Sequence, residues 1–329
     1  MSFSAQLKTV NNKNHDIYQP AIQFFAQIYF DLKKDSDFSG LANNFIFADE
    51  ESYPLILEDN GLRTTAGKVV GVAMHHMTSS DKVSHQLFFD ISKIWGLIFL
   101  DEKNNDGFNI NEEDRLFRLE HALNICVHEL GHVHFNNVLL GFNSNMVLEK
   151  DFDTRNLYSR FHHSTKRACI NEYLACLYAS TRINFDQNET YRALKENVDI
   201  YFRGCPNDAE KAFNKFYETH HYGELMNGIY MPIAFLLKSS SYFLGHIHGL
   251  DQKFDETDLY EKLKTTWFID YILKLEEILL SVYDKILNGE YDDSNLNHIS
   301  PLLDDLARLF GIKATPTQEQ DNVYVHIIK

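Results

Sequence analysis

Apolar residues recur at helical spacing in several long segments of the chain. Over residues 15–34 they fall on one face of a helix, which predicts an N-terminal helix. A helix is also predicted over 112–137, where three acidic residues (112–114) at the start suit the positive end of the helix dipole. The same periodicity predicts further helices over 164–182, 208–221, 223–245, 256–287 and 300–310. The C-terminal part of the chain is therefore expected to be all-α.

Two runs rich in β-branched and aromatic residues interrupt the helical pattern. Residues 68–77 and 85–100 have this composition, and the polar residues 78–82 between them are typical of a turn. We expect the two runs to form a small antiparallel sheet in the N-terminal part. The predicted fold is α+β and predominantly helical, with one region over 1–182 and a helical region over 183–329 that forms the other side of a cleft.

Composition and charge narrow the possible partners. The 329 residues are 44% apolar and carry 31 basic against 47 acidic side chains, a formal net charge of −16. So negative a surface repels phosphate backbones, which argues against nucleic-acid binding. The four cysteines form no CxxC pair, as expected of reduced thiols in the cytosol. The start of the chain has no apolar signal segment, and the longest apolar run, 228–237, is shorter than the ~20 residues of a membrane span. These features predict a cytoplasmic protein without a membrane partner.

The segment His128-Glu129-Leu130-Gly131-His132 is an HExxH motif inside the predicted helix 112–137. On a helix, positions i and i+4 lie one above the other, so His128 and His132 can offer imidazole nitrogens to one ion. Glu129 lies beside them and can accept a proton from water activated by that ion. The motif therefore predicts a Zn²⁺ site with Glu129 as the catalytic residue.

A catalytic zinc ion needs a third protein ligand, and Glu172 in the predicted helix 164–182 is the leading candidate. The metzincin arrangement would need histidine at position 138, where this chain has Val138. The helical neighbours of Glu172 are all small and would let another helix approach closely: Ala168, Cys169, Ala175, Cys176 and Ala179. A carboxylate on such a face is costly to bury unless it is paired or binds a metal. The alternatives are a cap or salt bridge for Glu172, with the third ligand supplied by Glu149, Asp151, Asp153, His162 or His163.

Taken together, HELGH and the later NExLA at residues 171–175 resemble the gluzincin metallopeptidases. The small residues after Glu172 are similar to those of the intracellular ImmA/IrrE-type proteases of bacteria and phages. The resemblance covers roughly residues 112–182. It implies a zincin-like catalytic region, a Zn²⁺ cofactor held by His128, His132 and Glu172, and hydrolysis of peptide bonds. A cytosolic protease needs restraint, so we expect limited proteolysis of a specific intracellular protein.

In gluzincins a further histidine or tyrosine often stabilises the oxyanion. Candidates here are Tyr173, Tyr222 and His246, together with His220, His221 and His248. A peptide substrate could add as a strand to the edge of the predicted sheet. Two other functions stay open: a non-catalytic binding protein that keeps the zincin scaffold, and a zinc hydrolase that acts on a non-peptide amide.

Overall fold

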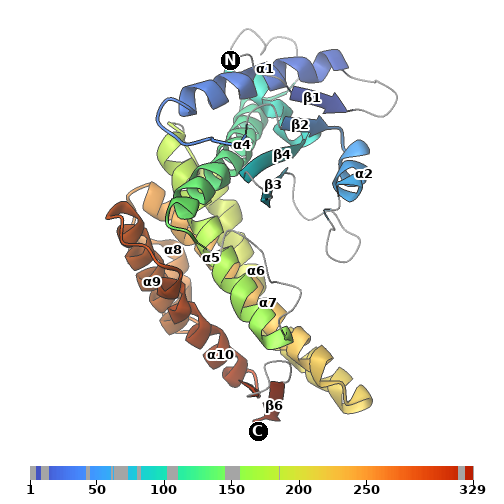
Figure 1. Cartoon of the computed structure of the whole chain (residues 1–329), viewed down its shortest axis with the longest axis vertical. Helices are drawn as coiled ribbons and strands as arrows, with labels where there is room; N and C mark the ends of the chain where they lie inside the picture. Colours follow the sequence, from blue (N-terminus) through green and yellow to red (C-terminus); the bar gives the residue numbers. More distant parts are fainter. Residues whose placement is uncertain are drawn as a thin grey trace. The chain divides into compact units, whose positions relative to one another are not determined.

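The computed structural model describes residues 5–8, 15–41, 45–60, 62, 73–79, 83–101, 110–144, 156–184, 186–317 and 323–328. Helices dominate these residues, which confirms the predicted α+β, mainly helical class (Figure 1). The α-helices are α1 (His15–Leu32), α2 (Ser52–Asp59), α3 (Ile91–Ile94), α4 (Glu112–Gly141), α5 (Leu157–Arg182), α6 (Asn188–Thr219), α7 (Tyr222–Gly249), α8 (Asp258–Leu263), α9 (Ile269–Leu287) and α10 (Ile299–Leu309). Short 3₁₀ helices are η3 (Trp95–Leu100), η6 (Phe254–Glu256) and η7 (Asp293–His298). The strands are β1 (Ala5–Lys8), β2 (Phe45–Ala48), β3 (Ala73–Ser79), β4 (Val83–Asp90), β5 (Ile312–Pro316) and β6 (Val323–Ile327).

The chain groups into two compact units. Unit 1 comprises Met1–Val138 and Tyr178–Thr190, and unit 2 comprises Leu139–Leu177 and Tyr191–Lys329. The chain passes between the units within α4, α5 and α6, whereas the predicted division has a single boundary after residue 182. HExxH therefore belongs to unit 1 and Glu172 to unit 2.

Unit 1 contains a four-stranded sheet in the order β1-β2-β4-β3. The expected antiparallel pair is present, since β3 and β4 pair from Ala73↔Phe89 to Ser79↔Val83. The sheet as a whole is mixed, because β1 and β2 add to it in parallel. The predicted antiparallel pair is therefore confirmed, and two parallel strands that were not predicted extend it. In the described part of the sheet, β3 forms one edge.

The predicted strand 85–100 ends at Asp90, so its second half is also corrected. The Asp90 carboxylate accepts hydrogen bonds from the backbone N–H and the hydroxyl of Ser92, at 3.0 and 2.6 Å, and thereby caps α3. The apolar residues that follow form α3 and η3 and are mostly buried. Burial, not strand pairing, explains their apolar character.

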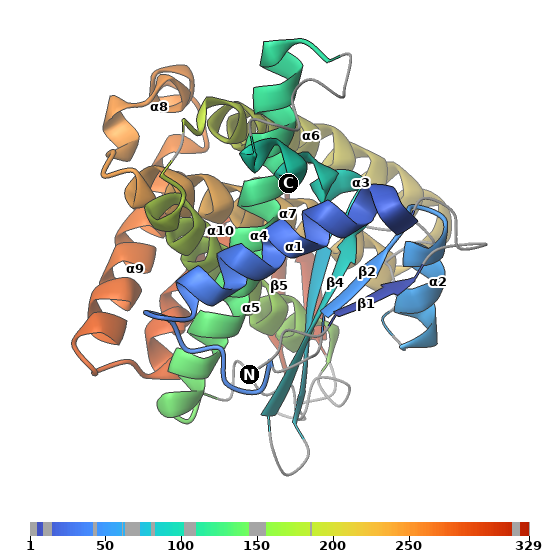
Figure 2. The same cartoon turned by 90° about the horizontal axis from the view of Figure 1, so that it is seen from above.

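The core of unit 1 is aromatic. Phe25 of α1 contacts Phe45, Phe47 and Phe89 of the sheet, with ring centroids 5.1–5.3 Å apart. These contacts hold α1 across one face of the sheet, as Figure 2 shows from above. A second apolar cluster joins α2 to β2 and β4, and it includes the buried ring of Tyr53.

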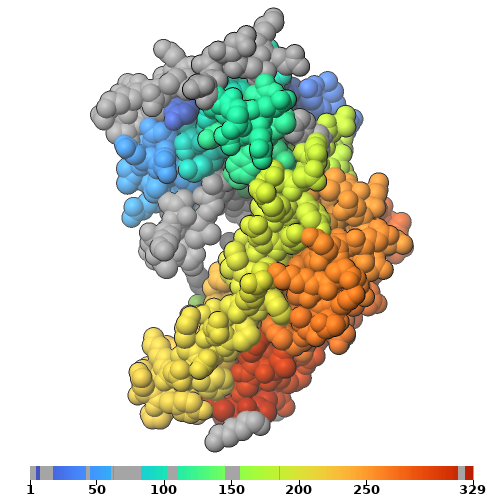
Figure 3. Space-filling model, turned by 180° about the vertical axis from the view of Figure 1, so that it is seen from behind, coloured from blue at the N-terminus to red at the C-terminus, as the bar shows by residue number. Residues whose placement is uncertain are grey.

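Unit 2 is mainly helical, with α7 deeply buried and α6 largely exposed. Most of α7 from Leu225 to Ile247 is buried, whereas α6 has only five buried side chains among 32 residues and lies on the surface in Figure 3 (yellow-green to yellow). A two-stranded antiparallel sheet of β5 and β6 follows α10, so the prediction of an all-α C-terminal part is wrong in this detail. None of the described helices combines the length and the apolar character needed to cross a bilayer.

Candidate metal centre

Helix α4 carries the HExxH motif, and its first turn explains why it begins where it does. The side chain of Asn111 accepts a hydrogen bond from the backbone N–H of Asp114 at 2.8 Å, which caps the helix. The acidic residues 112–114 then lie in the first turn, where the helix dipole favours negative charge. Farther along, Leu130 and Val133 are fully buried. The motif therefore lies on a rigid helix inside unit 1.

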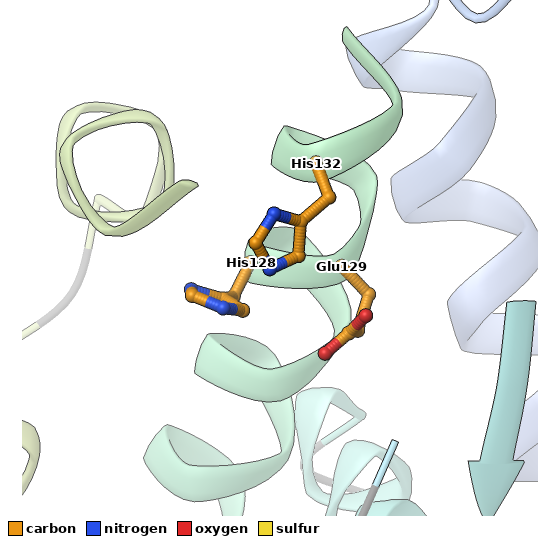
Figure 4. Close-up of side chains that lie close together, drawn as sticks. All are labelled: His128, Glu129 and His132. Carbon is orange, nitrogen blue, oxygen red and sulfur yellow. The ribbon is translucent and has the colours of Figure 1, made fainter. Parts of the chain in front are cut away.

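The structure brings His128, Glu129 and His132 together as the sequence predicts. One potential ligand atom from each residue lies within 4.8 Å of the others. The two imidazole rings are 4.6 Å apart between centroids and nearly perpendicular, at 84°. Figure 4 shows all three side chains projecting from adjacent turns of α4. His128 and Glu129 are only 8% and 9% exposed, so the group is largely shielded from water.

The chemistry of this group fits a zinc ion. Zinc binds imidazole nitrogen at about 2.0–2.1 Å, so two nitrogens of a tetrahedral site lie about 3.3 Å apart. Side-chain rotation alone can bring the imidazoles of His128 and His132 to that separation, because their rings are already neighbours. Among the described residues, no other group of three histidine, cysteine or acidic side chains has this arrangement.

Two buried groups of unit 1 interact with Glu129. Burial raises the pKa of Tyr53 well above its usual range, and the charges of Glu129 and Asp90 raise it further. Burial also raises the pKa of the Cys126 thiol, with a further contribution from Glu129. Tyr53 is therefore a protonated phenol close to the proposed catalytic carboxylate. Its role could not be predicted from the sequence, because residues 35–66 show no clear periodicity.

Glu172 lies on α5 within unit 2, where it forms an ion pair. Its Oε1 atom is 2.9 Å from Nζ of Lys238 on α7, and its side chain is 12% exposed. Of the alternative third ligands, His162 contacts the Asp304 carboxylate at 3.2 Å and His163 is buried. Glu149, Asp151 and Asp153 lie outside the described residues. The assignment of Glu172 as the third ligand stays a prediction.

Three of the candidates for the oxyanion-stabilising residue, Tyr173, Tyr222 and His246, also belong to unit 2. Tyr173 is fully buried, and its hydroxyl lies 2.9 Å from Nδ1 of His248, whose Nε2 is 3.0 Å from Glu276. His246 is also fully buried, and burial lowers its pKa to about 4. Tyr222, the first residue of α7, is 50% exposed. Tyr173 and His246 thus contribute to the core of unit 2, and Tyr222 is the accessible one of the three.

A scan of protein-family models, a search of curated proteins and a search of solved structures gave no significant match to this chain. The resemblance to gluzincins therefore rests on the residues of the motifs alone.

Proposed function

We propose that this protein is a zinc-dependent metallopeptidase that cleaves a specific intracellular protein. The observation that carries the proposal is the group formed by His128, Glu129 and His132 on α4, in which His128 and Glu129 are buried and His132 is half-buried. Two imidazoles four residues apart with a carboxylate beside them are the ligands and general base of HExxH hydrolases. Glu172 is proposed as the third ligand.

A zinc ion and Glu129 would have separate roles in the hydrolysis. A bound zinc ion would supply Lewis acidity, which polarises the substrate carbonyl and lowers the pKa of water. Glu129 would accept the proton of the attacking water and return it to the leaving amine. Its low exposure favours this role, because a shielded carboxylate exchanges protons with the substrate rather than with bulk solvent.

The sheet of unit 1 supports an extended peptide as substrate. Strand β3 is an edge strand, with β4 on one side only among the described strands. Its outer backbone groups could pair with an extended peptide, which is a common way to hold a polypeptide independently of its side chains.

The test combines metal analysis with the variant Glu129→Gln. We expect the purified wild-type protein to bind one zinc ion and to cleave a few peptides of a defined peptide library, detected by mass spectrometry. Glu129→Gln should keep the zinc and lose cleavage by at least about 10²-fold, because it cannot accept the proton. Glu113→Gln, an exposed position on the same helix, is the matched control and should behave as wild type.

Two results would overturn the proposal. Wild-type protein that binds no zinc would exclude the metal centre. Equal cleavage by Glu129→Gln and wild type would exclude Glu129 as the base. Indiscriminate degradation of added proteins would instead contradict the restriction to a specific partner.

A further inference from the structure

Helix α7 contacts α5 along one stripe of side chains in unit 2. Four residues of α7, spaced by three, four and three positions, lie on the same helical face. They are Lys238, Ser241, Gly245 and His248. On α5 they meet Cys169, Glu172 and Tyr173, so the contacts surround the proposed third ligand on both sides.

At Glu172 the contact is the ion pair with Lys238. The Nζ–Oε1 distance is 2.9 Å, and the two side chains are 34% and 12% exposed. The Lys238 ammonium also lies 5.5 Å from the centre of the Tyr242 ring. The carboxylate and the aromatic ring together restrict where the ammonium group lies.

The neighbouring contacts fix the backbone of α5 at this point. Gly245 packs directly against the backbone of Tyr173, where an added Cβ would lie 3.0 Å from the carbonyl carbon and closer still to its oxygen. One turn later His248 lies 2.9 Å from the hydroxyl of the same tyrosine. The residue that follows Glu172 is therefore held through both its backbone and its side chain.

We propose that Lys238 is a positioning residue for the metal ligand Glu172. Because the ammonium group holds Oε1, Oε2 would be the oxygen left for a bound ion, and the carboxylate would bind through that oxygen alone. A carboxylate can serve both partners, since its two oxygens offer about four acceptor positions. Groups that orient a ligand in this way typically contribute 10- to 100-fold to metal affinity. This inference rests on the proposed function, because it requires Glu172 to be a ligand.

The experiment measures zinc affinity directly, by competition with a chromophoric chelator, and needs no substrate. Lys238→Met keeps the length of the side chain without its charge and should weaken zinc binding 10- to 100-fold. Lys238→Gln keeps a hydrogen-bond donor and should lie between Lys238→Met and wild type. Lys262→Met is the matched control, because Lys262 forms a similar ion pair, 2.6 Å from Asp199, whose side chain is 19% exposed. It should bind zinc as wild type does.

Glu172→Gln separates this inference from the proposed ligand set. Zinc affinity unchanged in Glu172→Gln would remove the third ligand and the inference with it. If Glu172→Gln weakens binding but both Lys238 variants bind as tightly as wild type, or more tightly, only the positioning role is refuted. Tighter binding would mean that Lys238 competes with the metal. Circular dichroism checks folding, and Lys238→Gln alone decides if Lys238→Met does not fold.

Discussion

Gly245→Ala tests the close approach of α7 to α5 beside Glu172. An alanine Cβ would lie 3.0 Å from the carbonyl carbon of Tyr173, where ordinary contacts lie at 3.4–4 Å. Overpacking a core costs about 1–3 kcal/mol, and we expect the upper end, about 3 kcal/mol, because backbone atoms cannot rotate away. Alanine regains about 1 kcal/mol as a better helix former than glycine. The expected net loss is about 2 kcal/mol of unfolding free energy.

Thermal unfolding followed by circular dichroism measures this loss against a matched substitution. With an unfolding entropy of about 2.1 cal/mol/K per residue, the chain gains about 0.7 kcal/mol/K on unfolding, so Gly245→Ala should lower Tm by about 3 °C. Gly204→Ala in α6 is the control, since its nearest neighbour is a carboxylate oxygen of Asp208 at 3.7 Å. It should raise Tm by about 1 °C. Equal or higher Tm for Gly245→Ala would refute the close packing of the two helices.

Two further predictions concern the pH dependence of stability. Burial lowers the pKa of His246 to about 4 in the folded chain, so its stabilising contribution, complete above about pH 6.5, should fall by about 3 kcal/mol as the pH drops to about 4. His246→Leu should remove this fall in unfolding free energy, which urea unfolding between pH 4 and 7 measures. The Asp304 pKa is lowered, although burial acts in the opposite direction, because His162, Tyr158 and Tyr230 donate hydrogen bonds to its carboxylate. The stabilisation that ionised Asp304 provides is present above about pH 4 and is lost below it. Asp304→Asn should therefore remove this change in unfolding free energy between pH 3 and 5, and it should cost about 1–3 kcal/mol at pH 7.

The long helices were predictable because each shows its periodicity over many residues. Helix α4 is the clearest case, since its apolar pattern agrees with the acidic first turn over 112–114. Strands β1 and β2 have only four residues each, too few for a pattern, and their parallel partners are distant in sequence. Residues 91–100 were misread because an apolar run without periodicity is compatible with either a strand or a buried helix.

The residues of the candidate metal centre were likewise predictable only where local sequence determines their arrangement. His128, Glu129 and His132 are recognisable because the helix alone brings them together. The partners of Glu129 and Glu172 come from other elements within each unit. Tyr53 lies near Glu129 in unit 1, Lys238 forms an ion pair with Glu172 in unit 2, and no spacing in the sequence connects either partner to the motif.

The small residues around Glu172 have an explanation in unit 2 that is independent of any metal. Small side chains leave space for the approach of another helix, and α7 makes such an approach through Gly245 at Tyr173. Ser241 of α7 likewise lies beside Cys169, where it opposes the rise that burial causes in the pKa of that thiol. Close packing of α5 on α7 would select small side chains whether or not Glu172 binds zinc, and Lys238 already compensates the buried charge. The zinc affinity of Glu172→Gln therefore distinguishes a metal ligand from an ion-pair partner.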